Sequence, residues 1–400
     1  MGKALFLSTP VPGHVNPTLA LVGELVQRGE QVVYVSTQDF RPSVEHVGAE
    51  FRAYPPMPMP DLSTMENLVD VAEFALSVTR DFMPDILERV AAEKPDYILH
   101  DALAMGGKIA AARLGVPAVS TCPVFAVRPG RSTGLFRYDL EILRMVSTAL
   151  PAMIRAFRIG GQIQRLYGHT GGPLDAFLNL EPVNLVFTSR AFQPHGNRFG
   201  PQYLFVGPQL AMRPQFGDVP LDRLDDRPLV YVSMGTIYNR NLDFYRQCLE
   251  AFADGRFQVI LSIGNNDIGA LGPIPPNAIV RNTVPQLQVL ERADAFITHG
   301  GMNSASESLY HGVPLVLIPQ GGDQLMVALR VHQLGAGIHL NRNKVTPERL
   351  RALTERVIAD PSFRERGRFI GDSFRATGSH IAAADAVLAY VRNGVIPASR

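Results

Sequence analysis

The chain has 400 residues, and two domains are expected because single cores usually stop growing below this length. With 46% hydrophobic and 19% charged residues, it has enough apolar side chains for two cores. Its 38 Lys and Arg residues balance 37 Asp and Glu residues, and the net charge of +1 gives no reason to expect a nucleic acid or a membrane surface as a partner. No apolar run approaches the ~18 residues of a membrane span, and the amino terminus lacks a signal peptide's long apolar stretch, so a cytoplasmic protein without stable membrane insertion is predicted.

The first 120 residues alternate short apolar strands with helical periodicity. Strands are predicted at 4–8, 31–36, 50–54, 96–100 and 117–121, and helices at 15–28, 40–47, 65–92 and 104–114. Two more strands are predicted at 183–189 and 203–207. Such alternation is typical of a doubly wound parallel sheet.

Residues 125–176 interrupt this alternation with a helix-prone, arginine-rich segment. Its arginines are Arg128, Arg131, Arg137, Arg144, Arg155, Arg158 and Arg165. Between the first and the last of them only Asp139 and Glu141 are acidic. Two interpretations remain open: a solvated face of irregular helices, or a cap over a substrate cleft that touches anionic or lipid-surface molecules.

A polar, proline-rich stretch at 208–227 is predicted to link this domain to a second alternating series. Strands are predicted at 228–236, 258–264, 278–282, 295–300, 314–320 and 336–340, and helices at 242–253, 285–291, 303–310, 324–334, from 347 onward and at 381–392. The fold class is therefore α/β, with two Rossmann-like doubly wound domains facing a central cleft, at 1–207 and 228–378, and a terminal helix within 379–400 that packs back towards the first domain. The cleft is the default ligand site.

In the first domain, two polar residues stand at the carboxyl ends of strands, where such sheets bind ligands. His14 opens the first helix, and a helix amino terminus disfavours the charged imidazolium, so His14 is suited to act as a neutral base near pH 7. Asp101 follows the strand at 96–100 and is able to orient such a base. Taken alone, His14 is better interpreted as a capping or solvated residue, and Asp101 as the N-cap of the helix at 104–114.

In the second domain, polar turns follow three strands. The turn SMGT holds Ser233 and Thr236 beside a glycine, a weak indication of an anion site. The stretch THGGMNSASE is a stronger one, because its paired glycines allow close backbone approach and its polar side chains, with the helix amino terminus, suit a diphosphate. The residues in question are His299, Gly300, Gly301, Asn303, Ser304 and Glu307. His299 adds a donor that becomes cationic if it gains a proton, and an ordinary strand–helix turn is the alternative.

The third turn, PQGGDQ, ends in Asp323 and Gln324, which offer hydrogen bonds to sugar hydroxyls or else cap the following helix. No Asp-x-Asp pair, zinc-type spacing or EF-hand pattern occurs, so no metal is expected and a leaving diphosphate would be stabilised by N–H groups and hydroxyls. No G-x-G-x-x-G follows the first strand, which argues against NAD. Cys122 and Cys248 are expected to be reduced, buried thiols.

The stretch from Val284 to Gln324, VPQLQVLERADAFITHGGMNSASESLYHGVPLVLIPQGGDQ, resembles the nucleotide-sugar signature of the GT-B, family 1 glycosyltransferases, the UDP-glycosyltransferase superfamily, and most closely its bacterial macrolide glycosyltransferase type. The early GHVNPTLALVGEL is similar to their acceptor-domain motif. The resemblance covers almost the whole chain and is weakest at 55–80 and 125–176.

This resemblance implies an acceptor-binding domain at 1–207 and a nucleotide-sugar domain at 228–378. It implies His14 as general base and Asp101 as its partner. For the donor it implies Ser233, His299, Asn303 and Ser304 at the diphosphate with Thr236 as a further candidate, Glu307 at the ribose, Asp323 and Gln324 at the hexose, and Val284 and Gln286 beside the base. The chain has no Trp to stack on uracil as plant members do, so a TDP-sugar stays open beside UDP.

The expected function is an inverting, metal-independent transfer of a hexose, taken as glucose, from a UDP-sugar to a hydroxyl of an apolar small molecule such as a macrolide, a flavonoid or another phenol. The nucleotide sugar is a co-substrate, no other cofactor is expected, and the protein is predicted to be a monomer or weak homodimer. The alternatives are a TDP-sugar-dependent antibiotic glycosyltransferase, a UDP-GlcNAc epimerase or lipid-linked GlcNAc transferase of the same fold, and a non-catalytic helper protein.

Overall fold

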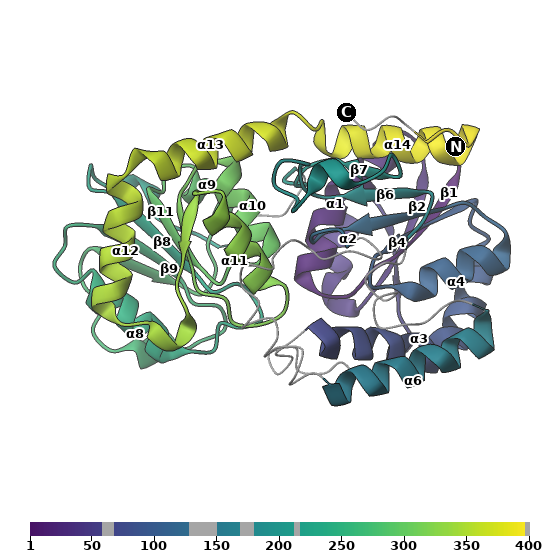
Figure 1. Cartoon of the computed structure of the whole chain (residues 1–400), viewed down its shortest axis with the longest axis horizontal. Coiled ribbons are helices and arrows are strands. Elements are labelled where there is room, and N and C mark those ends of the chain that lie inside the picture. Colours follow the sequence, from purple (N-terminus) through teal and green to yellow (C-terminus); the bar gives the residue numbers. More distant parts are fainter. Residues whose placement is uncertain (58–67, 128–149, 169–179, 212–216, 397–400) are drawn as a thin grey trace. The chain divides into compact units, whose positions relative to one another are not determined.

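The computed structural model describes residues 1–57, 68–127, 150–168, 180–211 and 217–396 (Figure 1). These residues form two compact units. The first unit contains the described residues up to 211 together with 374–396, and the second contains 217–373. The boundary between them falls inside the segment 208–227 that the sequence predicts as a linker, and the chain re-enters the first unit within its last helices.

The first unit is built on a seven-stranded, wholly parallel sheet in the order β3-β2-β1-β4-β5-β6-β7. The strands are β1 (Lys3–Leu7), β2 (Gln31–Ser36), β3 (Glu50–Ala53), β4 (Tyr97–Asp101), β5 (Ala118–Cys122), β6 (Val183–Val186) and β7 (Tyr203–Phe205). The order reverses direction between β1 and β4, and ligands of doubly wound sheets bind at such a switch point. Leu7 of β1 pairs with His100 of β4, which brings the ends of these two strands together.

Helices cover both faces of this sheet. They are α1 (Pro12–Gln27), α2 (Arg41–His46), α3 (Leu68–Glu93), α4 (Met105–Leu114), α6 (Leu150–Tyr167) and α14 (Ser379–Asn393). Alternate strand residues feed two cores: Phe6 packs with residues of α1 and α14, and its neighbours Leu5 and Leu7 pack with residues of α3 and α4. Helix α1 begins three residues before the predicted Val15, because Pro12 occupies a helix's first turn with its φ already helical.

The second unit contains a six-stranded parallel sheet in the order β10-β9-β8-β11-β12-β13. Its strands are β8 (Leu229–Ser233), β9 (Gln258–Ser262), β10 (Ala278–Arg281), β11 (Ala295–Thr298), β12 (Leu315–Leu317) and β13 (Gly337–His339). Its helices are α8 (Leu242–Ala251), α9 (Gln286–Leu290), α10 (Met302–Tyr310), α11 (Gln324–Gln333), α12 (Pro347–Ala359) and α13 (Pro361–Arg375). Here the switch point lies between β8 and β11, where Ser233 pairs with Thr298.

The helical stretch that follows Pro347 is interrupted, which the sequence pattern did not indicate. Asp360 is extended and Pro361 starts a new helix, because proline restricts the residue before it to extended conformations. Helix α13 ends in the first unit, where the ring of Phe374 meets that of Phe192 edge-on at 5.6 Å. Helix α14 then packs on α1, and Arg28 and Asp385 join the two helices at 2.5 Å.

Of the arginine-rich segment, residues 128–149, with the first four arginines, lie outside the described residues. Helix α6 buries Ala156 and Ile163 in the core shared with α3, and it exposes Arg155, Arg158 and Arg165. Arg155 pairs with Glu73 of α3 at 2.6 Å. Helix α6 thus presents these arginines to solvent together with the exposed side chains of Phe157 and Leu166, and both interpretations of the segment stay open.

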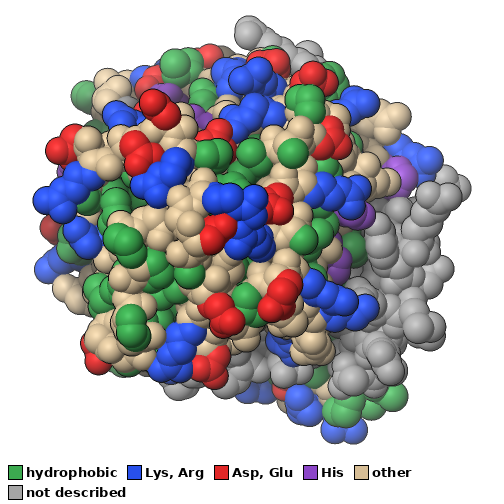
Figure 2. Space-filling model, turned by 90° about the vertical axis from the view of Figure 1, so that its left-hand side faces the viewer, with side chains coloured by type: hydrophobic (Ala, Val, Ile, Leu, Met, Phe, Trp, Pro, Cys, Tyr) green, Lys and Arg blue, Asp and Glu red, His purple; other side chains and the backbone are tan. Residues whose placement is uncertain are grey.

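Charges of both signs are interspersed over the face shown in Figure 2, without a large patch of one sign. No helix within the described ranges is long and apolar enough to cross a membrane. Cys122 and Cys248 are free and buried as expected, and burial raises the pKa of the Cys122 thiol to about 12.

Candidate functional site

The first unit brings the two predicted catalytic residues together at its switch point. His14 lies in the first turn of α1, after β1, and Asp101 is the last residue of β4. The Nδ1 atom of His14 is 2.8 Å from Oδ2 of Asp101, and the side chains are 12% and 1% exposed. A carboxylate accepts hydrogen bonds, so a neutral His14 ring carries its proton on Nδ1 and presents Nε2 as its basic nitrogen.

Asp101 is held by groups that the sequence did not single out. Its Oδ1 accepts a hydrogen bond from the Thr9 hydroxyl at 2.6 Å and one from the Leu103 amide at 2.9 Å. The alternative reading of Asp101 as a helix N-cap is wrong, because α4 begins after Ala104 and has no side-chain cap. Thr9 follows β1 by two residues, so its place at a strand end was the available signal.

A buried His–Glu pair supports the backbone of Asp101. His100 has no exposed surface, and its Nδ1 lies 3.1 Å from the carbonyl oxygen of Asp101 while its Nε2 lies 3.1 Å from Oε1 of Glu181. A carbonyl only accepts, so Nδ1 carries a proton, and the contact of Nε2 with the Glu181 carboxyl group links β4 to the residues just before β6. Gly107 permits this arrangement, because a Cβ there would stand 2.3 Å from that of His100.

We expect Glu181→Leu to lower the free energy of unfolding by about 2 kcal/mol, since it leaves a buried imidazole nitrogen without its partner. Glu181→Gln keeps a hydrogen-bonding group at the same place and is expected to lose less than half as much. Urea unfolding followed by circular dichroism measures both. Equal stability of the leucine variant and the parent would contradict the role given to the pair.

In the second unit, the imidazole of His299 is enclosed by backbone at the other switch point. It follows β11, next to the end of β8. A Cβ on Gly235 would lie 2.5 Å from its Cε1, and a Cβ on Gly301 would lie 2.5 Å from its Nε2. Glycines at 235 and 301 are therefore required for the ring to sit between these two turns.

His299 is neutral near pH 7. Burial lowers the pKa of its imidazole to about 4, and a hydrogen bond with the backbone of Ser233 opposes this shift without outweighing it. The ring keeps some accessible surface, but the groups packed around it remove most of its hydration. Near pH 7, His299 therefore offers a ligand a neutral hydrogen-bond donor or acceptor. The cationic form that the sequence analysis considered is populated only in acidic solution, near pH 4 and below.

This lowered pKa predicts a pH-dependent stability. The unfolded His299 titrates near 6.5 and the folded one near 4, so its contribution is present above pH 6.5 and is lost as the pH falls towards 4. Between pH 7 and pH 5 we expect the stability advantage of the parent over His299→Gln to shrink by about 2 kcal/mol. Urea unfolding of both proteins at the two pH values measures it, and an advantage that stays constant contradicts the assignment.

Three residues from three elements form a partly buried chain of hydrogen bonds. The Tyr231 hydroxyl of β8 donates to Oε1 of Gln286 at 2.9 Å, and Nε2 of Gln286 donates to Oε2 of Glu307 at 2.5 Å. Glu307 is 1% exposed. Gln286 and Glu307, which the family resemblance places at the base and the ribose, are thus neighbours. Tyr231 joins them from β8, a strand whose apolar sequence gave no indication of a polar role.

The turn before α10 brings the glycine pair close to the predicted sugar residues. Gly300 has φ +81, a conformation open to glycine, and a Cβ there would lie 3.4 Å from the carbonyl oxygen of Gln324. Asn303 and Ser304 occupy the first turn of α10. The N-cap residue of this helix is Gly301, so no side chain caps its first N–H groups. The amino terminus of α10 thus carries two of the predicted diphosphate residues.

Gln324 closes its own turn. Its Oε1 accepts hydrogen bonds from the amides of Gln320 at 2.8 Å and Gly321 at 3.3 Å. Asp323 occupies the N-cap position of α11, as the alternative interpretation expected, and its side chain makes no capping hydrogen bond to the helix. Thr236 is exposed beside Gly235, and Val284 is buried just before α9.

Within the described residues, no group of three or more His, Cys, Asp or Glu side chains is placed to hold a metal ion.

Two doubly wound parallel sheets, each with polar side chains at its switch point, define a two-domain α/β protein of the class whose ligands bind at strand ends. Residues 246–380 match the family model described as erythromycin biosynthesis protein CIII-like, C-terminal domain. The chain is 34% identical to the uncharacterized UDP-glucosyltransferase YojK of Bacillus subtilis, over 98% of both chains. It is 32% identical to demethyllactenocin mycarosyltransferase of Streptomyces fradiae, over 96% of this chain and 85% of the relative.

Among solved structures, the calicheamicin glycosyltransferase CalG4 superposes with a TM-score of 0.81 at 29% identity, over 98% of this chain and 99% of CalG4. The chain belongs to the family 1 glycosyltransferases of the bacterial macrolide type, and it is a glycosyltransferase with the GT-B fold. It therefore uses a nucleotide sugar and a small-molecule acceptor.

Proposed function

We propose that this glycosyltransferase transfers glucose from UDP-glucose to a hydroxyl of an apolar natural product or phenol, with inversion and without a metal ion. The observation that carries the proposal is the 2.8 Å contact between His14 Nδ1 and a buried Asp101 at a switch point. A histidine oriented in this way, with its basic nitrogen on the far side of the ring, is the arrangement that deprotonates a hydroxyl.

In the proposed reaction, the acceptor oxygen attacks the anomeric carbon from the face opposite the diphosphate. A bond forms between this oxygen and the anomeric carbon, the bond from that carbon to the diphosphate oxygen breaks, and the hydroxyl proton moves to His14. Asp101 stabilises the imidazolium that forms, and the Thr9 hydroxyl and Leu103 amide keep the carboxylate in place. The diphosphate leaves with the bonding electrons, and the reaction balances without an added reagent.

We assign donor binding to the switch point of the second unit. The first turn of α10, with Asn303 and Ser304, offers N–H groups to a diphosphate. Ser233, at the end of β8, pairs with Thr298 at the end of β11, the strand that leads into α10. Neutral His299 contributes one hydrogen bond and no charge, so stabilisation of the leaving group falls to these dipoles. Glu307 is proposed for the ribose, Asp323 and Gln324 for the hexose, and Val284 and Gln286 for the base.

UDP-glucose is chosen as donor on the similarity to YojK, whose name specifies a UDP-glucosyltransferase, while the mycarosyltransferase shows that relatives differ in sugar. An apolar acceptor is chosen because that relative and CalG4 are named for demethyllactenocin and calicheamicin. A TDP-sugar is the second candidate donor, since the absence of Trp removes one uracil-stacking side chain.

The test is release of UDP by the purified protein in EDTA, with UDP-glucose as donor and a panel of phenols and macrolides as acceptors. We expect release that depends on the acceptor, and a product whose anomeric configuration, read by NMR, is opposite to that of the donor. Activity that EDTA abolishes would overturn metal independence. Release with TDP-glucose but not UDP-glucose would overturn the donor, and donor conversion without acceptor would indicate an epimerase.

A further inference from the structure

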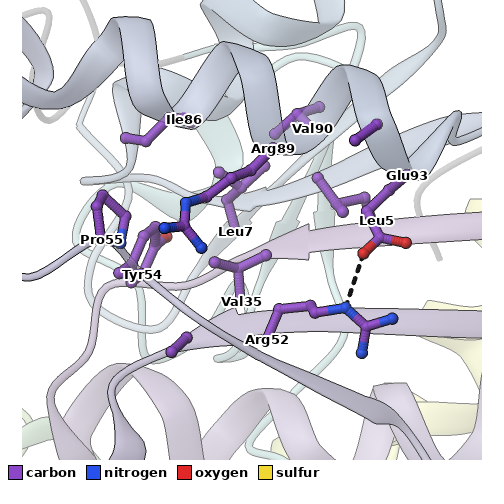
Figure 3. A pocket seen from close by; sticks show the side chains of 12 residues that line it. Leu5, Leu7, Val35, Arg52, Tyr54, Pro55, Ile86, Arg89, Val90 and Glu93 are labelled. Atoms are coloured by element: carbon purple, nitrogen blue, oxygen red, sulfur yellow. Dashed lines mark hydrogen bonds and ion pairs between the residues drawn. The ribbon is translucent and has the colours of Figure 1, made fainter.

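A cavity of about 180 Å³ lies in the first unit between the sheet and the second half of α3 (Figure 3). Its walls are mainly apolar: Leu5, Leu7, Val35, Ile86, Val90 and Ala92. Ala53, Tyr54 and Pro55 close it at the end of β3. None of these residues is His14, Asp101 or Thr9, and the nearest link to that group is the hydrogen bond from the Tyr54 hydroxyl to the Ser8 carbonyl oxygen at 2.7 Å.

Two cations, Arg52 and Arg89, and one anion, Glu93, form the charged rim of this cavity. Arg52 forms an ion pair with Glu93, with 2.7 Å between Nε and Oε1. Glu93 also forms an ion pair with Lys3, with 2.8 Å between Oε2 and Nζ. Arg89 is the exception: within the part of the chain that the structure describes, its side chain makes no hydrogen bond or ion pair, and Figure 3 shows its guanidinium turned towards Tyr54 and Leu7. An apolar cavity with an unpaired guanidinium at its edge complements a molecule with an apolar body and one anionic end.

The volume limits the size of this molecule. A cavity near 150 Å³ with apolar walls accommodates one benzene ring, whereas drug-sized ligands require about 300 Å³ or more. A single ring therefore fills the present cavity, and a macrolide or a flavonoid does not enter it. A carboxylate attached to the ring would reach the rim, where a planar guanidinium binds it with two parallel hydrogen bonds.

We propose that this cavity is a second small-molecule site, and that it binds a one-ring aromatic carboxylate with the ring between the sheet and α3 and the carboxylate on Arg89. The site does not depend on the proposed transfer reaction. A ligand of about nine heavy atoms at this depth is expected to bind with a dissociation constant near 1 mM.

The experiment is ligand-observed NMR of benzoate with the full chain, and benzamide serves as the uncharged probe of the same shape. We expect benzoate to bind at least several-fold more tightly than benzamide. Arg89→Met removes the charge, keeps the aliphatic stem, and is expected to weaken benzoate about fivefold, the upper range for an exposed ion pair. Arg80→Met, at a half-buried arginine of α3 that does not line the cavity and pairs with Asp81, is the control for loss of a positive charge on this helix and should leave the affinity unchanged.

Ala92→Phe fills the cavity from an exposed position of α3, where a larger side chain is compatible with folding, and it is expected to abolish benzoate binding. This variant also separates the cavity from the acceptor site, because binding there would survive it. The proposal is overturned if benzoate does not bind at about 20 mM, if benzamide binds equally well, or if the affinity is the same in Arg89→Met and Ala92→Phe as in the parent.

Discussion

We expect His14→Ala to lower kcat by about 10³-fold while UDP binds with unchanged affinity. General-base catalysis by a positioned side chain contributes about 10²–10⁴-fold, and the buried Asp101 carboxylate at 2.8 Å makes His14 the positioned base of this unit. Uridine diphosphate should bind normally because the residues assigned to it belong to the other unit. Initial rates of UDP release and calorimetric titration with UDP measure the two quantities.

His46→Ala is the matched control for this variant. His46 is an exposed histidine at the end of α2 in the same unit, and its removal should leave kcat within twofold. If His14→Ala glycosylates phenols at the parent rate, the base assignment is wrong. A variant that loses UDP binding together with activity would point instead to a disturbed fold.

The second large effect is expected from Gly235→Ala, which should weaken UDP binding by about tenfold to a hundredfold. Gly235 has φ +73, where a Cβ costs about 1–2 kcal/mol, and that Cβ would also stand 2.5 Å from Cε1 and 2.7 Å from Nε2 of His299. Either the imidazole or the turn after β8 has to move, and both belong to the proposed diphosphate site. Overpacking of this kind costs a further 1–3 kcal/mol or so.

Gly272→Ala separates these two costs. Gly272 has φ +85 in the same unit, but a Cβ there meets nothing within 4 Å. Its ψ of −154 lies in a region essentially confined to glycine, so Gly272→Ala should lose stability through backbone strain alone and leave UDP affinity unchanged. Equal UDP affinities of the two variants would show that the position of His299 does not matter for donor binding, and the assignment of this turn to the diphosphate would fall.

The neutral state of His299 bears on how the leaving group is stabilised. A ring with a pKa near 4 donates a hydrogen bond at pH 7 but brings no positive charge to the diphosphate. The first turn of α10 and the hydroxyls of Ser233 and Ser304 then carry the stabilisation in the proposed mechanism, which depends on fixed dipoles that need no reorganisation during the reaction.

Much of this protein follows from local sequence patterns. The alternation of apolar strands with helical periodicity predicts two doubly wound domains, and the position of His14, Asp101, Ser233 and His299 just after strands marks them as candidate ligand residues. The prediction of two parallel-sheet domains succeeds because strand and helix periods and glycine turns are properties of short segments, and the ligand roles of the residues at strand ends stay a prediction. The same local reasoning missed the break before Pro361. The segments on both sides have helical periodicity, and the single extended residue between them, Asp360, does not interrupt that pattern visibly.

What the tertiary structure decided is which strand ends meet. The orders β2-β1-β4 and β9-β8-β11 place His14 beside Asp101 and Ser233 beside His299, although 87 residues separate the first pair. The groups around them, such as Thr9, the His100–Glu181 pair and Tyr231, depend on pairings between distant segments, and so does the lowered pKa of His299. The sequence by itself determined the family, the two sheets and the candidate residues, because motifs and periodicities within short segments indicate them. Strand order, burial and the partners of each polar group came only from the folded chain, because they arise where distant segments pack together.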